Sequence, residues 1–132
     1  MVTGELVSGS GYARSMSSES TLFEQIVARE IPADIVFETD SIIAFRDIAP
    51  QAPVHLLVVP KTEVFANVVE LAAGDPALLA ELVATADRLA QEFSNGEFRL
   101  IFNTGPSSGQ TVFHVHAHVL SGALEEGSLG RQ

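Results

Sequence analysis

Residues 114–118 read His-Val-His-Ala-His and run on into Val119 and Leu120, so histidines alternate with apolar residues. The chain has four histidines, and three of them lie in this run. An alternation of period two is typical of a β-strand, whose side chains at i, i+2 and i+4 point to one face. We therefore expect His114, His116 and His118 to line one face of a strand, where three titratable rings indicate function more than packing.

Three interpretations of this histidine run are open. A His-x-His pair can bind zinc, but a closed site needs a fourth ligand, and the chain has no cysteine to supply one. A purely structural role would require a partner for every buried ring nitrogen. Catalysis fits best, because a neutral imidazole is a nucleophile near pH 7 and a neighbouring ring can donate to a phosphate or a leaving group.

Size and charge exclude several classes of protein. The 132 residues suit one compact domain, and a net charge of −10 with only seven Lys and Arg disfavours binding to a nucleic-acid polymer or an anionic membrane. No apolar run is long enough to span a bilayer. The Gly- and Ser-rich residues 1–20 are expected to form a flexible tail without a signal peptide. The absence of cysteine fits a cytoplasmic protein.

The apolar patterns predict an α+β fold in which helices pack on an antiparallel meander. Thr21 and Glu24 match a capping box that opens a helix ending before Pro32. A longer helix begins at Pro76 and is closed by Asn95-Gly96. The expected strands are residues 34–38, 42–45, 54–59, 98–103 and 111–120.

The loop before the histidine run has the composition of a phosphate site. Gly105 and Gly109 allow backbone N–H groups to approach an anion, and hydroxyl or amide donors lie among them: Ser107, Ser108, Gln110 and Thr111. A Gly-Ser loop alone is more often only a turn. Its place directly before three histidines favours the phosphate interpretation.

Asp47 follows an apolar strand and precedes a connector with two prolines, residues 48–53. A carboxylate at a strand end can accept two hydrogen bonds from the vicinal hydroxyls of a ribose, although an isolated aspartate here more often starts a turn. Phe45 and Ile48 beside it could sandwich a base, or they could simply pack in the core.

The run His-Val-His-Ala-His-Val-Leu resembles the signature of the histidine triad family. Further segments are similar to its histidine triad nucleotide-binding protein branch over residues 22–122, above all Pro50-Gln-Ala-Pro53, His55, Val59-Pro-Lys61 and Gly109-Gln110. The resemblance implies a domain over residues 21–122, with tails at 1–20 and 123–132. It also implies a five-stranded antiparallel sheet with an N-terminal helix and one long helix, continued across a homodimer.

The resemblance assigns roles to individual residues. His116 corresponds to the nucleophile that attacks the α-phosphorus, His118 to the residue that assists the leaving group, His114 to the orienting member, and His55 to a fourth histidine of the site. Asp47 corresponds to the ribose ligand. The remaining expected nucleotide contacts are the phosphate positions Asn103, Gly109, Gln110 and Thr111 and the purine-pocket positions Phe23, Ile26, Phe45 and Ile48.

The chain also departs from its relatives. Arg46 stands where His or Asn is common, and we expect it to add positive charge near the nucleotide. Thr21 and Glu24 replace a Cys-x-x-Cys pair, and the Trp-containing tail of the best-known members is absent. We expect a hydrolase of purine nucleoside 5′-phosphoramidates that uses no metal or cofactor. The alternatives are a dinucleoside polyphosphate hydrolase and a purine nucleotide-binding interaction protein with vestigial activity.

Overall fold

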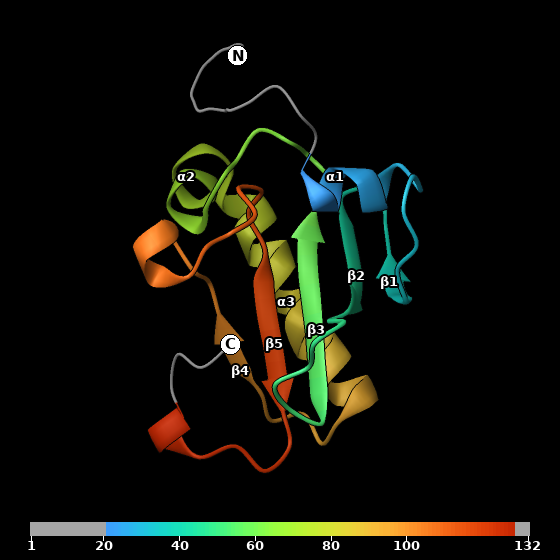
Figure 1. Ribbon diagram of the computed structural model, residues 1–132, viewed down its shortest axis with the longest axis vertical. Coiled ribbons are helices and arrows are strands. Elements are labelled where there is room, and N and C mark those ends of the chain that lie inside the picture. The colour runs from blue at the N-terminus through green and yellow to red at the C-terminus, as the bar shows by residue number, and fades with distance from the viewer. Residues whose placement is uncertain (1–20, 129–132) are drawn as a thin grey trace. The chain divides into compact units, whose positions relative to one another are not determined.

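The computed structural model describes residues 21–128 as two compact units, one ending at Ile31 and one beginning at Pro32. Figure 1 labels the helices and strands and colours them from the N-terminus to the C-terminus. The tail predicted at residues 1–20, and the part of the C-terminal tail beyond residue 128, lie outside the described residues. No helix in the described part is both long and apolar enough to cross a membrane.

The first unit contains helix α1 (Leu22–Val27), and the predicted capping box is confirmed. Thr21 Oγ1 accepts the Glu24 N–H at 3.1 Å, and Glu24 Oε1 accepts the Thr21 N–H at 3.1 Å. The helix is shorter than predicted, because Arg29 takes a left-handed φ of 62°, which interrupts helical geometry well before Pro32.

The second unit is built on an antiparallel sheet of five strands, as predicted. They are β1 (Ile35–Glu38), β2 (Ile42–Arg46), β3 (Val54–Pro60), β4 (Arg99–Ile101) and β5 (Ala117–Ser121). Their order is β1-β2-β3-β5-β4, so β5 inserts between β3 and β4. The expectation of a simple meander is therefore wrong for the last two strands. This insertion brings the histidines to the middle of the sheet.

Helix α3 (Pro76–Phe93) covers one face of this sheet and lies behind the strands in Figure 1. Asp75 caps it through a bond from the Leu78 N–H to Oδ1 at 3.1 Å. Its end follows the prediction, since Gly96 takes a φ of 91° and donates to the Ala90 carbonyl at 3.1 Å. The core between helix and sheet includes Ile42, Ala44, Leu56, Val58, Leu82, Ala86, Leu89, Ala117 and Val119.

A second helix, α2 (Val68–Gly74), was not predicted. Its apolar pattern is too short to stand out, but its start carries a recognisable signal. Asn67 Oδ1 accepts the Glu70 N–H at 2.9 Å, and Glu70 Oε1 accepts the Ala66 N–H at 2.8 Å. An Asn followed three residues later by Glu is a variant of the capping pattern that identified α1.

Strand β5 begins at Ala117, so the strand predicted over residues 111–120 is wrong for residues 111–116. The ladder with β3 stops at the pair Val58 and Ala117. Pro60 would stand opposite Val115 in the same register, and proline has no N–H to continue the ladder. The Val115 N–H donates instead to the Phe65 carbonyl at 3.0 Å. Only His118 of the three histidines lies within the regular strand.

The two faces of the sheet carry different residues because side chains alternate along each strand. Ile42 and Ala44 of β2 belong to the core cluster with α3. Their neighbours Ile43 and Phe45 point the other way, to the face that also carries His118. We call this the histidine face. The strands thus separate the apolar core from the polar groups described next.

Candidate active site

His55 and His118 meet on the histidine face although they are far apart in the sequence. His55 of β3 lies opposite Leu120 of β5, and His118 is two residues earlier on the same strand. This diagonal relation places their rings within reach. His55 Nε2 and His118 Nδ1 are 3.0 Å apart, and both residues are buried.

A backbone group fixes which nitrogen of His55 carries the proton. The Gln51 N–H, in the proline connector, points at His55 Nδ1 at 3.0 Å. An N–H can only donate, so Nδ1 accepts and the neutral ring carries its proton on Nε2. His55 Nε2 then donates to His118 Nδ1, which leaves the proton of His118 on Nε2.

His116 has the opposite tautomer. Its Nδ1 is 2.8 Å from the His114 carbonyl, which can only accept, so Nδ1 carries the proton and Nε2 carries the lone pair. Its ring and that of His118 meet edge to face, with centroids 5.2 Å apart. The two neighbouring rings thus offer an N–H at His118 Nε2 and a lone pair at His116 Nε2.

His114 organises this pair through its backbone as well as its ring. The ring is buried, and Nε2 donates to the Pro60 carbonyl at 2.7 Å, which anchors residue 114 to the end of β3. The carbonyl of the same residue accepts the proton of His116. The orienting role implied by the resemblance is therefore consistent with a main-chain contact.

Burial lowers the pKa of three of the four histidines, His55, His116 and His118. The pKa of His118 is lowered to about 4, chiefly by desolvation and also by His116 and His55, while Asp47 opposes the shift. Desolvation also lowers the pKa of His116, although its bond to the His114 carbonyl acts in the other direction. The pKa of His55 is lowered for the same reason, against the opposing charge of Asp47. At neutral pH these rings are uncharged in the ligand-free protein.

Asp47 lies directly after β2 and beside this pair. Its Oδ1 accepts the Ala49 N–H at 2.8 Å, and its Oδ2 is 3.4 Å from His55 Nε2. The side chain is 18% exposed, so that lone pairs remain open to a ligand on one side. The turn-initiating role and a ligand role can therefore coexist in this residue.

Asp47, His55 and His118 could in principle hold a metal ion, since one donor atom from each lies within 4.8 Å of the others. A metal on His55 Nε2 would need the proton of that ring on Nδ1. The Gln51 N–H already points at Nδ1. Metal-bound histidines instead direct the second nitrogen toward an acceptor. The donor set therefore fits a metal poorly.

The loop before the histidines turns at both glycines, but its backbone N–H groups do not point outward as expected for an anion site. Gly105 has a φ of 90° and Gly109 a φ of 93°, and a short 3₁₀ turn, η2 (Pro106–Ser108), joins them. The Ser108, Gly109 and Gln110 N–H groups donate to carbonyls within the loop. The exposed donors are thus the hydroxyls of Ser107, Ser108 and Thr111 rather than these N–H groups.

Gln110 holds the loop together. It is buried, its Oε1 accepts the Gly105 N–H at 2.9 Å, and its Nε2 donates to the Ala66 carbonyl at 2.6 Å and the Val112 carbonyl at 3.1 Å. A side chain so fully bonded contributes to a phosphate site by fixing the loop. We therefore replace the expected direct phosphate contact with this indirect one.

Arg46 lies on the wrong face for the role expected of it. It contacts Asp34, with Nε 3.1 Å from Oδ2, and its guanidinium lies 5.2 Å from the ring centroid of Phe93 on α3. These contacts belong to the helix-covered side of the sheet, because residue 46 alternates with residue 47. The expected positive charge near the nucleotide is a misassignment.

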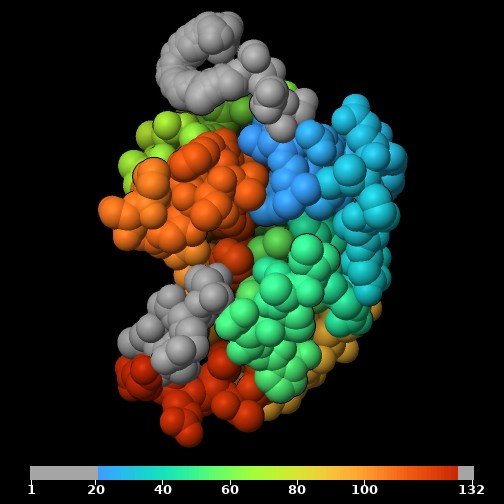
Figure 2. All heavy atoms as spheres, in the orientation of Figure 1, coloured from blue at the N-terminus to red at the C-terminus, as the bar shows by residue number. Residues whose placement is uncertain are grey.

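The other expected nucleotide contacts have varied surroundings. Phe45 is buried on the histidine face, Ile48 in the connector is 97% exposed, and Asn103 is partly buried after β4. Phe23 and Ile26 are buried residues of α1 in the other compact unit, so their purine-pocket role stays a prediction. Figure 2 shows the orange loop and the green connector on two sides of a hollow, with red-orange atoms between them.

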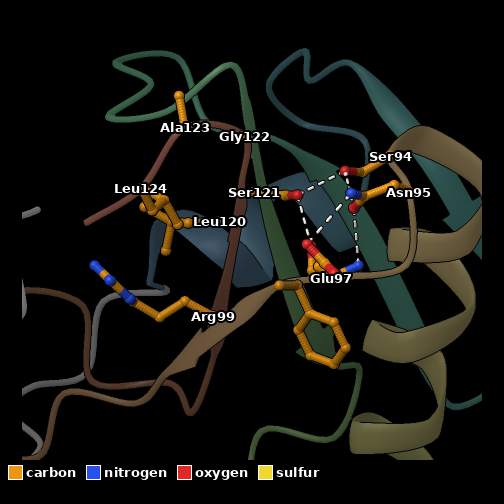
Figure 3. A pocket seen from close by; sticks show the side chains of 10 residues that line it. Ser94, Asn95, Glu97, Arg99, Leu120, Ser121, Gly122, Ala123 and Leu124 are labelled. Carbon is orange, nitrogen blue, oxygen red and sulfur yellow. Dashed lines mark hydrogen bonds between the residues drawn. The ribbon is translucent and has the colours of Figure 1, made fainter. Parts of the chain in front are cut away.

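A second hollow lies beside the end of β5 (Figure 3), and no motif in the sequence pointed to it. Ser121 Oγ donates to the Glu97 carbonyl at 2.6 Å and lies 2.6 Å from Ser94 Oγ. Arg99 Nη2 donates to the Glu125 carbonyl at 2.9 Å. These bonds tie β4 and the C-terminal segment to the end of β5.

Sequence reasoning missed two backbone groups of the site, the Gln51 N–H and the Pro60 carbonyl. Neither has a side-chain signature, because every residue offers the same main-chain groups. Both nevertheless lie in segments that carried the family resemblance, Pro50–Pro53 and Val59–Lys61. Their contacts give those segments a physical purpose, which is to orient His55 and His114.

Comparison with known proteins gives a consistent picture. The family model described as HIT domain matches residues 28–124. An uncharacterized HIT-like protein of Synechococcus elongatus is 53% identical over 106 residues, covering 80% of this chain and 92% of the relative. The purine nucleoside phosphoramidase of Escherichia coli is 40% identical over 107 residues, covering 80% and 89%. A HIT family hydrolase from Legionella pneumophila superposes with a TM-score of 0.75 at 44% identity, covering 80% and 95%.

Proposed function

Because this chain belongs to the HIT domain family, we propose that it is a hydrolase that cleaves purine nucleoside 5′-phosphoramidates through a nucleotidyl group on His116. The observation that carries the proposal is the bond from His116 Nδ1 to the His114 carbonyl, which leaves the ring lone pair on Nε2. The similarity to a relative named purine nucleoside phosphoramidase supports the choice of substrate class.

In the first step, the His116 Nε2 lone pair forms a bond to the α-phosphorus as the bond from phosphorus to the amine nitrogen breaks. The departing nitrogen needs a proton to leave as a neutral amine. His118 Nε2 is the proposed source, so His118 is an imidazolium at this moment and a neutral imidazole afterwards.

In the second step, water forms a bond to phosphorus as the bond to His116 Nε2 breaks. The water proton passes to His118 Nε2, which returns His118 to the imidazolium form. The products are the nucleoside monophosphate and the amine. The same nitrogen thus acts first as acid and then as base, as microscopic reversibility requires of a double displacement.

The nucleotide is proposed to bind across the histidine face. The exposed hydroxyls of Ser107, Ser108 and Thr111 would donate to phosphate oxygens, with Asn103 as a further polar contact. Asp47 would accept from the ribose, and the base would cover Ile48, whose exposure is otherwise unfavourable. We also propose a cytoplasmic homodimer, which the partly buried edge strand β4 supports as a pairing surface.

The proposal is tested with a panel of AMP-amine substrates, compared with a diadenosine polyphosphate, on the parent and on His116→Asn. We expect the parent to prefer the phosphoramidates and His116→Asn to lose at least about 1,000-fold in kcat, since loss of a nucleophile removes the covalent route. AMP binding by His116→Asn should persist and serves as the control for folding.

Three outcomes would contradict the proposal. Near-parental turnover by His116→Asn would exclude the nucleotidyl-histidine. A preference for the diadenosine polyphosphate would point to a dinucleoside polyphosphate hydrolase. Tight AMP binding with negligible turnover of every substrate would favour a nucleotide-binding interaction protein.

A further inference from the structure

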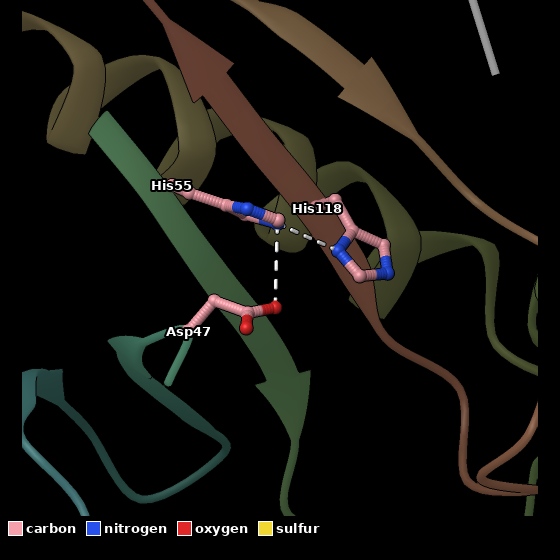
Figure 4. Close-up of side chains that lie close together, drawn as sticks. All are labelled: Asp47, His55 and His118. Carbon is pink, nitrogen blue, oxygen red and sulfur yellow. Dashed lines mark hydrogen bonds and ion pairs between the residues drawn. The ribbon is translucent and has the colours of Figure 1, made fainter. Parts of the chain in front are cut away.

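His55 Nε2 has two acceptors within reach, and only one proton to offer them. His118 Nδ1 is 3.0 Å away and Asp47 Oδ2 is 3.4 Å away. Figure 4 shows both contacts converging on the same His55 nitrogen, with Asp47 and His118 on either side of it. The carboxylate and the imidazole therefore compete for this hydrogen bond.

The competition matters because of the state that His118 must reach in the proposed reaction. An imidazolium carries a proton on each nitrogen. A proton on His118 Nδ1 would face the proton on His55 Nε2, and two donors cannot bond to each other. His55 cannot relieve this conflict by moving its own proton to Nδ1, because that nitrogen faces the Gln51 N–H.

The charged and titratable groups near His118 indicate how the conflict between the two N–H groups can be relieved. His116 beside it and His55 on β3 both lower the pKa of His118, whereas Asp47 raises it. On β4 the residue opposite His118 is Ile101, which does not titrate, and Arg99 faces Leu120 one step further along. Among residues 21–128, Asp47 is therefore the neighbour that can accept a hydrogen bond from a protonated His118 Nδ1.

We propose that Asp47 is a positioning residue for the acid–base step: its carboxylate takes over the His55 Nε2–H and accepts the His118 Nδ1–H when His118 becomes an imidazolium. One carboxylate oxygen and one ring nitrogen of each histidine already lie within 4.8 Å of one another. A small rotation of the partly exposed carboxylate would complete the contact. This role rests on the proposed function and adds to the ribose contact expected of the same residue.

This role of Asp47 does not change the number of protons transferred in the proposed reaction. His118 Nδ1–H remains bonded to the carboxylate while Nε2–H passes to the leaving amine, and the resulting neutral ring carries its proton on Nδ1. The lone pair on Nε2 then accepts the proton of water in the second step. Without Asp47, neutral His118 would keep its proton on Nε2 and would be a very weak acid.

The test is Asp47→Asn assayed with two AMP derivatives that share the nucleotide and differ in the leaving group. An alkylamine needs a proton to depart, whereas p-nitrophenolate leaves as a stable anion. We expect kcat for the alkylamine to fall at least tenfold more than kcat for p-nitrophenolate. Equal losses with both would overturn the role, because a ribose contact alone does not depend on the leaving group.

Two controls separate this role from binding and from charge. Asp40→Asn removes the same charge from an exposed turn residue and should leave the ratio of the two kcat values unchanged. In the parent protein, 2′,3′-dideoxy versions of both substrates remove the ribose hydroxyls and should raise KM for the two leaving groups alike.

A spectroscopic measurement does not depend on turnover. Nitrogen NMR of His118 in the AMP complex should show protonation of Nδ1 in the parent, and an Nε2–H tautomer in Asp47→Asn. The same Nε2–H tautomer in both proteins would overturn the proposal. If the parent hydrolysed neither substrate, the proposed function would fail, and this measurement would still decide the role of Asp47.

Discussion

The two faces of one sheet in this protein are stabilised in different ways, although they share the same strands. On the helix-covered face, Ile42 and Ala44 of β2 pack against α3, and contact area determines their contribution. On the histidine face, each polar group has a particular partner, and direction determines what it can do. Arg46 and Asp47 are adjacent in sequence, yet one contacts α3 and the other contacts His55.

Because the two faces of the sheet are separate, we expect that the stability of this small protein and its chemistry can be changed independently. Substitutions on the helix-covered face should alter the free energy of unfolding and leave the reaction of the folded molecules intact. Substitutions on the histidine face should alter proton positions, with smaller effects on packing.

Leu82→Ala should have the largest effect on stability. Leu82 is fully buried on α3 within the core cluster, and replacing such a leucine costs about 2–5 kcal/mol through lost burial and a cavity. Urea unfolding should show this loss, while kcat per folded molecule stays within twofold of the parent. A stable variant with impaired kcat would contradict the separation of the two faces.

The pH dependence of stability should reveal His118. Its pKa is about 4 in the folded protein against 6.5 for an ordinary histidine, so the unfolded chain binds more protons between these values. Stability from this group is complete above about pH 6.5 and is lost as pH falls toward 4, by an amount on the order of 3 kcal/mol.

His118→Gln provides the comparison for this pH effect. The free energy of unfolding of this variant, measured by urea at several pH values, should fall less steeply between pH 6.5 and 4 than that of the parent. His55 and His116 contribute to the slope in both proteins, so the difference belongs to His118. Identical slopes would show that burial does not keep His118 neutral.

Arg46→Gln should have the smallest effect. Its ion pair with Asp34 is exposed, and exposed pairs contribute about 0–1 kcal/mol, with a similar contribution from an exposed cation–π contact. We expect kcat/KM to stay within twofold of the parent, because the guanidinium lies on the face away from the histidines. A tenfold rise in KM for the nucleotide would restore Arg46 to the binding site.

Local patterns predicted most of the elements, and long-range pairing explains where they failed. The capping box of α1 and the start of α3 depend on neighbouring residues and were confirmed. The insertion of β5 between β3 and β4 depends on contacts between distant segments, which alternation along one strand cannot reveal. Helix α2 was missed because its apolar pattern is short.

The candidate site shows the same division. The histidine pattern indicated a segment that the structure brings against His55, but the ladder ends before His116 because Pro60 has no N–H to offer. Arg46 was misassigned because sequence proximity to Asp47 does not reveal which face a side chain occupies. The tautomers of His55 and His116 depend on the Gln51 N–H and the His114 carbonyl, and main-chain groups leave no trace in a sequence.

The proposed reaction passes through a covalent bond between phosphorus and His116. The configuration at phosphorus tests it most directly, using a chiral AMP-amine substrate with sulfur on the α-phosphorus, hydrolysed in isotopically labelled water. Two successive in-line displacements, first by His116 Nε2 and then by water, should give overall retention of configuration. Inversion would show that water attacks the substrate directly and would exclude the nucleotidyl-histidine.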